Sequence, residues 1–266
     1  YLGLQITRDR ARRTITPTQS HMVHQFLQRF GFRYSSPQSA PLPTGHLLSA
    51  PHLDESIEPS GLYPELVGCL IYQTELWYAA KRVLRYLCST SGMGLMLGGR
   101  GPVVLTGHAD ASWVDDLATQ RSSQGFTFSL GSGSVSWRST RPSSVLSFSC
   151  KAEIYAVAMA AQDLGWPTYL LTDLGEWPRS SPVLYVDNKA MIALCWDHRL
   201  EHRTKHIALR YFLARELQQH GQLCLTYAAS RANTADVFTK ALQPCDHLRF
   251  CTVLGLVPTF PHLLTS

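Results

Sequence analysis

The sequence lacks the features of secreted, membrane-spanning and zinc-binding proteins. No apolar run reaches the roughly 18 residues that a transmembrane helix needs, and the first residues do not follow the basic, apolar, small-residue order of a signal peptide. The seven cysteines are odd in number and scattered, with no CxxC pair. We therefore expect reduced thiols in an intracellular protein that is not secreted and has no membrane partner.

An initiator methionine is also missing, so we expect either a piece of a longer protein or a coding region that has lost its start. The 266 residues, of which 45% are hydrophobic, suffice for one large domain or two small ones. The net charge of +5 is small, but basic residues cluster with aromatic ones in residues 1–33 and 199–215. Such clusters suit a polyanion such as nucleic acid. On charge alone, two solvated surface faces are the more common explanation.

Residues 1–98 differ in pattern from the rest. A short strand is expected near the start, followed by an amphipathic helix from Thr18 to about Phe30. Residues 35–61 are rich in proline and predict an extended connector, and residues 62–90 return to helical periodicity. A glycine-rich break then separates this first region from the second.

From residue 102 the pattern predicts the order β-β-β-α-β-α-α-β-α. Two alternating runs flank Gly131-Ser132-Gly133, which is typical of a hairpin. The first helix is rich in alanine, and Pro167 should break it at Gly165–Trp166. Three antiparallel strands followed by crossover units describe a mixed α/β sheet with helices packed on its faces.

Four acidic residues lie at strand ends or helix starts of this second region. Asp110 follows the first strand, and Glu153 lies in the first turns of the first helix. Asp187 ends the strand VLYV, and Asp236 lies at the start of the last helix. Such positions meet in one crevice of an α/β sheet. Any one of these acids alone is more often a helix cap or a turn residue.

Four carboxylates in one crevice would repel one another unless cations neutralised them. Mg²⁺ prefers oxygen ligands, and two such ions about 4 Å apart can drive hydrolysis of a phosphodiester. The sequence therefore predicts a metal site formed by the four acids.

Several stretches identify a family when they are taken in order. They are YLGLQITRD, PLPTG, YPELVGCLIY, AAKRVLRYLCSTSGMGL, GHADASWVDDLATQRSSQGFTFSLGSGSVSWRS, KAEIYAVAMAA, LYVDNKAMIAL, HRTKHIALRYFLAREL and ADVFTKAL. Together they resemble the C-terminal part of a copia-type LTR retrotransposon Pol polyprotein, where the end of reverse transcriptase is followed by ribonuclease H (RNase H). The resemblance covers nearly the whole chain.

The resemblance implies a fold and a division of the chain. The fold is α/β, an RNase H-like mixed five-stranded sheet with helices on its faces. A small α+β remnant of the thumb and connection region of reverse transcriptase would precede it, in residues 1–98. The RNase H domain would span residues 102–243, and residues 244–266 would form a C-terminal tail.

The resemblance also implies an activity: Mg²⁺-dependent endonucleolytic hydrolysis of the RNA strand of RNA–DNA hybrids during reverse transcription. It assigns catalysis and the binding of two Mg²⁺ ions, with Mn²⁺ as a possible substitute, to four residues, namely Asp110, Glu153, Asp187 and Asp236. Asp236 would complete the shell of the second ion. The partners would be the hybrid and the upstream palm and fingers, in a cytoplasmic virus-like particle or in the nucleus.

Four further residues are expected to contact nucleic acid. Arg203 and Lys205 would bind backbone phosphates, and Asn188 would reach the minor groove. His206 would assist proton transfer or contact a phosphate, with a structural role as the alternative.

The chain departs from the family pattern at three places. No polymerase carboxylates are present, so it cannot polymerise DNA. Gln73 runs directly into Thr74, where the family has an additional segment with a TRPDI-type stretch. SCKAE replaces STEAE before the catalytic helix, which puts Lys151 near the crevice. These departures leave an alternative, a catalytically decayed relic that binds nucleic acid without cleavage. An integrase is a third candidate, disfavoured by the ADVFTKAL and RTKHI stretches.

Overall fold

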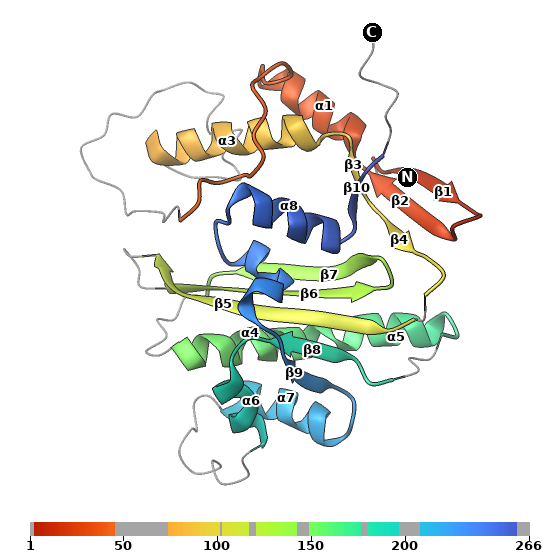
Figure 1. Ribbon diagram of the computed structural model, residues 1–266, viewed down its shortest axis with the longest axis vertical. Helices are drawn as coiled ribbons and strands as arrows, with labels where there is room; N and C mark the ends of the chain where they lie inside the picture. Colours follow the sequence, from red (N-terminus) through yellow and green to blue (C-terminus); the bar gives the residue numbers. More distant parts are fainter. Residues whose placement is uncertain are drawn as a thin grey trace.

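A mixed five-stranded sheet forms the centre of the molecule (Figure 1). In chain order its strands are β5 (Leu105–Asp116), β6 (Arg121–Leu130), β7 (Gly133–Thr140), β8 (Val183–Val186) and β9 (Cys224–Tyr227). They lie side by side in the order β7-β6-β5-β8-β9. The first three pair antiparallel, and β5, β8 and β9 pair parallel. The predicted hairpin is therefore present.

The computed structural model describes most of the chain, and the statements below concern these residues. They are 3–45, 74–101, 103–116, 121–142, 149–176, 180–196 and 208–259.

Helices supply the crossovers between the parallel strands. They are α4 (Ser149–Asp163) and α5 (Gly165–Asp173) before β8, then α6 (Lys189–Trp196) and α7 (Ala208–Gln219) before β9. As far as β9, this order matches the predicted one, and the predicted α/β class with an RNase H-like mixed five-stranded sheet is confirmed.

Small side chains let α4 pack closely on the sheet. Ala152, Ala156 and Ala160 are fully buried, and they belong to one core cluster with Phe126 and Phe128 of β6. Alanine on the helix leaves room for these rings while the two backbones come close. This packing fixes the start of α4, and with it Glu153, beside the central strands.

The predicted break near Pro167 is confirmed. Helix α4 ends at Asp163, and α5 begins at Gly165. Pro167 is buried in the first turn of α5, where the missing backbone N–H leaves no hydrogen bond unmade.

The first region forms a second, smaller layer. Strands β1 (Gln5–Asp9) and β2 (Thr14–Thr18) pair with each other, and β2 also pairs with β4 (Leu97–Gly98). Helices α1 (Ser20–Arg29) and α3 (Thr74–Thr90) share the buried cluster Leu27, Ala80 and Leu84. The predicted helix near Thr18–Phe30 is thus α1. The connector beyond residue 45 and the junction at Gln73 lie outside the described residues.

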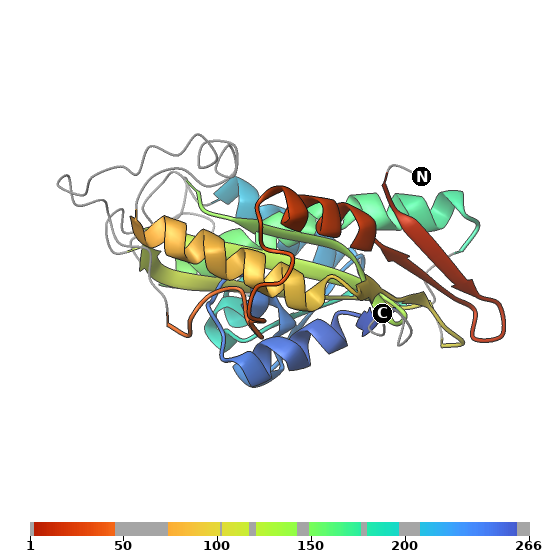
Figure 2. The same cartoon turned by 90° about the horizontal axis from the view of Figure 1, so that it is seen from above.

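The segment expected to be a C-terminal tail contains a helix and a strand. Pro244 begins α8 (Pro244–Val253), and β10 (Leu256–Pro258) pairs antiparallel with β3 (Met93–Leu95). Figure 2 shows α8 and β10 alongside the first region. His247 of α8 lies 3.0 Å, Nε2 to Oη, from Tyr86 of α3.

A close backbone approach locks this C-terminal segment onto the β6–β7 hairpin. Gly255 has φ +93°, and a Cβ atom there would lie 2.7 Å from the Cα of Gly133. Only glycine fits this position.

No helix among the described residues is long and apolar enough to cross a membrane. Four cysteines have side chains that the structure describes, and all four are free thiols: Cys88, Cys224, Cys245 and Cys251.

Candidate metal centre

Three of the four predicted acids come together. Asp110 lies on β5, Glu153 lies in the first turn and a half of α4, and Asp187 directly follows β8. One carboxylate oxygen from each lies within 4.8 Å of the others. Strands β5 and β8 are parallel neighbours, so the two aspartates reach the same end of the sheet. A cluster of this size matches the oxygen ligand set of a hard divalent cation.

Glu153 is the member of this triad of acids that has a buried oxygen without a hydrogen-bond partner. Its side chain is 9% exposed, and its Oε2 atom is buried with no hydrogen-bond partner in the part of the chain that the structure describes. Burial, and then the charges of Asp110 and Asp187, raise the pKa of its carboxyl to about 9. A cation at the triad would give this oxygen a partner, so the residues present fit a metal ion.

Asp110 is held from its other side by the segment after β9. It is 1% exposed, and it accepts a hydrogen bond from the Thr239 hydroxyl. The Lys240 ammonium lies 3.1 Å from its Oδ1. The side chain of Asn233 donates to the Ala109 carbonyl at 2.9 Å, which fixes this segment against β5.

Asp187 has a similar support. The Ser230 hydroxyl donates to its Oδ2 at 2.6 Å from a short 3₁₀ turn, η2 (Ser230–Ala232). This hydrogen bond orients the carboxylate while leaving its other oxygen for a ligand.

Asp236, the fourth predicted acid, stands apart from the triad. It lies on η3 (Thr234–Phe238), which is a 3₁₀ helix rather than the expected α-helix. Lys240 comes between Asp236 and Asp110, with its Nζ 2.8 Å from the Asp236 Oδ1. Burial and the charge of Asp110 raise the pKa of Asp236 to about 6, although Lys240 opposes this rise.

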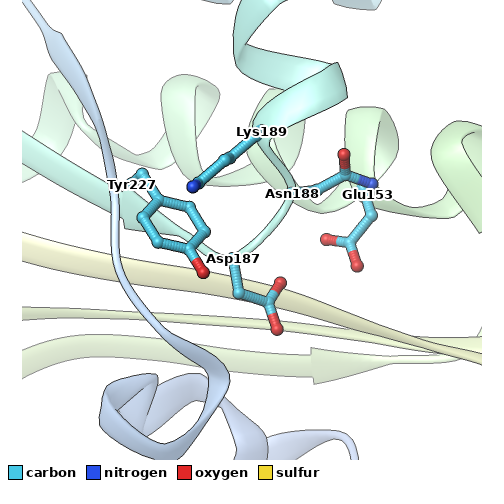
Figure 3. Close-up of a pocket in the computed structure, with 5 residues that line it drawn as sticks. All are labelled: Glu153, Asp187, Asn188, Lys189 and Tyr227. Atoms are coloured by element: carbon cyan, nitrogen blue, oxygen red, sulfur yellow. The ribbon is translucent and has the colours of Figure 1, made fainter.

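An open cavity of about 520 Å³ leads to the triad (Figure 3). Glu153, Asp187, Asn188, Lys189 and Tyr227 line it. The Lys189 ammonium lies 4.5 Å from the centre of the Tyr227 ring, a cation–π contact. The cavity therefore joins acids, a cation and an aromatic face.

Comparison with known proteins identifies relatives of the chain. No protein-family model matches the chain. Over 95% of its length it is 30% identical to a Retrovirus-related Pol polyprotein from transposon TNT 1-94 of Nicotiana tabacum. Over 70% of its length it is 34% identical to the corresponding polyprotein from transposon RE2 of Arabidopsis thaliana. The homologues of the chain are retrovirus-related Pol polyproteins from plant transposons.

The chain spans only a small part of the length of these relatives. It spans 21% of the tobacco relative and 13% of the Arabidopsis one. The tobacco alignment, at 282 residues, is longer than the chain itself. That relative therefore carries residues with no counterpart here.

A solved RNase H1 isolated from compost is similar in structure, with 13% identity and a TM-score of 0.40. The match covers 51% of the chain described here and 92% of that enzyme. The strand order and strand directions of the central sheet, rather than this score, define the fold.

The nucleic-acid contacts expected from sequence are described only in part. Asn188 lines the cavity, and its Oδ1 accepts from the Met191 backbone N–H at 3.0 Å, so it also caps α6. Arg203, Lys205 and His206 lie outside the described residues.

Sequence reasoning missed three residues at this site, Lys189, Tyr227 and Lys240. Of the three, Lys240 could have been predicted from sequence, because a lysine four residues after Asp236 suggests an ion pair within one segment. Lys189 and Tyr227 are separated by 38 positions, and only the pairing of β8 with β9 brings them together.

Proposed function

We propose that the protein is the RNase H part of a retrotransposon Pol polyprotein and cleaves the RNA strand of RNA–DNA hybrids. The observation that carries this proposal is the convergence of Asp110, Glu153 and Asp187 around a buried, unpartnered carboxylate oxygen. Similarity to the Pol polyproteins and the RNase H-like sheet support it.

The triad would hold the divalent cation, with Mg²⁺ as the natural ion and Mn²⁺ as its substitute. When bound, the ion would act as a Lewis acid that activates water and neutralises charge on the phosphodiester. The oxygen of water bonds to phosphorus, and the bond from phosphorus to the 3′ oxygen breaks. The 3′ oxygen takes up a proton, so the products end in 3′-hydroxyl and 5′-phosphate.

The side chains of the protein divide the remaining tasks. Thr239 and Ser230 hold Asp110 and Asp187 in position through their hydroxyl groups. Glu153 lines the cavity beside Asn188, where the RNA 2′-hydroxyl would approach. That hydroxyl distinguishes RNA from DNA.

The cavity provides the path for the RNA strand. Tyr227 is 44% exposed, and Lys189 lies over its ring. An aromatic face can stack on a base or sugar, and an ammonium can contact a phosphate. Both stand next to Asp187, so a nucleotide bound here would place its neighbour at the triad.

The proposed setting is the reverse-transcription complex of the polyprotein. The partners are the hybrid and the polymerase palm and fingers encoded upstream. The complex would work in a cytoplasmic virus-like particle or in the nucleus. The polymerase reaction itself is assigned to the upstream part.

The test is a substrate panel with the purified full chain. End-labelled RNA in a hybrid should be cut in Mg²⁺ and Mn²⁺ but not in EDTA, with 3′-hydroxyl and 5′-phosphate ends. Single-stranded RNA and duplex DNA should stay intact. Salt-dependent hybrid binding without cleavage in either ion would favour the decayed relic instead.

Tyr227→Ala should weaken hybrid binding about tenfold. Stacking on one base contributes about 1–3 kcal/mol, and about 1.4 kcal/mol corresponds to a factor of ten in the dissociation constant. Fluorescence anisotropy with a labelled hybrid in EDTA would measure the change without cleavage.

Tyr169→Ala is the matched control, because Tyr169 is also exposed but lies on α5. It should bind the hybrid like the wild type. Equal dissociation constants for all three proteins would contradict the assignment of this cavity to the nucleic acid.

A further inference from the structure

The candidate metal centre contains a cation of its own. The Lys240 ammonium lies 3.1 Å from Asp110 Oδ1 and 2.8 Å from Asp236 Oδ1. Lys240 directly follows Thr239, whose hydroxyl bonds the other oxygen of Asp110. Two neighbouring residues thus bind both oxygens of the most buried aspartate.

The two sides of Asp110 differ in charge. Toward Glu153 and Asp187 it faces two carboxylates, and among the described residues the buried Glu153 Oε2 atom there has no hydrogen-bond partner. Toward Asp236 it faces an ammonium that both aspartates bind. Only the first side calls for an added cation, because on the second side the charge is already compensated.

We propose that the Lys240 ammonium takes the place of a second divalent ion between Asp110 and Asp236. The centre would then bind a single divalent ion, at Asp110, Glu153 and Asp187. This inference rests on the proposed function, and it revises the expectation that Asp236 completes the shell of a second metal ion.

The chemistry of lysine supports this role. An ammonium has three N–H donors, and the two aspartates use two of them. The third donor is available to a phosphate oxygen of the substrate.

If Lys240 only formed a structural ion pair, the centre would still bind two divalent ions. The number of bound ions therefore distinguishes that alternative from the proposal. Mn²⁺ is titrated into the full chain, and the free ion is measured by electron paramagnetic resonance. The wild type should bind one ion at the centre. Lys240→Met removes the ammonium while keeping most of the side-chain length, and it should bind two.

Two further variants separate charge from folding. Lys240→Arg keeps the cation and should bind one ion, as the wild type does. Asp236→Asn should also still bind one, because Asp236 contacts Lys240 and not the metal ion. Circular dichroism would show whether Lys240→Met folds. If it does not, the ion count of Asp236→Asn still tests the proposal.

The inference is overturned if the wild type binds two ions, if Asp236→Asn lowers the count from two to one, or if a folded Lys240→Met still binds one. Cleavage of the hybrid, measured on the same samples, separates this inference from the proposed function. A wild type that cleaves but binds two ions refutes only the role of Lys240. A wild type that neither binds Mn²⁺ nor cleaves refutes both.

Discussion

Asp110→Asn should lower the rate of hybrid cleavage by at least about 10³-fold. Asp110 lies in the middle of the centre. Glu153 and Asp187 are close to it on one side, and the Lys240 ammonium is close to it on the other. Asparagine keeps the shape but loses the charge that attracts a divalent cation. Losing about 4 kcal/mol of transition-state stabilisation corresponds to this factor. Initial rates on a labelled hybrid in Mg²⁺ would measure it.

Asp173→Asn is the matched control for this variant. Asp173 is an exposed carboxylate at the end of α5, a helix that contributes no residue to the triad. It should keep the wild-type rate. A thermal melt would verify that both variants are folded. A folded Asp110→Asn that cuts within tenfold of the wild type would refute the role of the triad.

Glu153→Gln should stabilise the metal-free protein at high pH by a few kcal/mol. The folded-state pKa of Glu153, about 9, lies above its unfolded value near 4.5. The folded state therefore holds the proton more tightly, and the stability from this group is fully present below about pH 4.5. It is lost as the pH rises toward 9. Glutamine cannot ionise, so the variant should not show this loss.

Urea unfolding in EDTA at several pH values would measure the difference. The free energy of unfolding of the wild type should fall relative to Glu153→Gln between about pH 5 and pH 9. Mn²⁺ should reverse the order, because the wild type gains the free energy of ion binding. Glu216→Gln, an exposed change on α7, should follow the wild type. Parallel pH curves for wild type and Glu153→Gln would contradict the buried, unpartnered carboxylate.

The strands and the triad follow from local sequence pattern. Asp110 and Asp187 end apolar runs, and adjacent parallel strands bring such ends together. Glu153 is close because the alanine face of α4 packs tightly on β6. Apolar runs and the alanine spacing of α4 are local patterns, and together with one rule of sheet topology they suffice to predict the triad.

The remaining features depend on contacts between distant parts of the chain. Helix α8 packs against the first region, where its His247 meets Tyr86 across 161 positions. Strand β10 exists because β3 offers it a free edge. The position of Asp236 next to Lys240 depends on η3. The Asn233 side chain links η3 to β5, because it donates to the Ala109 carbonyl and accepts from the Ala235 backbone N–H. No periodicity within either segment reveals these partners.

The C-terminal segment also decides where the gene can be cut for expression. An Nη2 atom of Arg249, in α8, donates to the Arg231 carbonyl at 2.8 Å. Arg231 adjoins Ser230, which holds Asp187. A fragment ending at residue 243 would therefore lose the contact of Arg249 with Arg231. This contact lies next to Ser230, whose hydroxyl holds the proposed metal ligand Asp187. The fragment would also uncover the hairpin surface against which Gly255 packs. The useful expression unit extends through β10 and includes β3, its pairing strand.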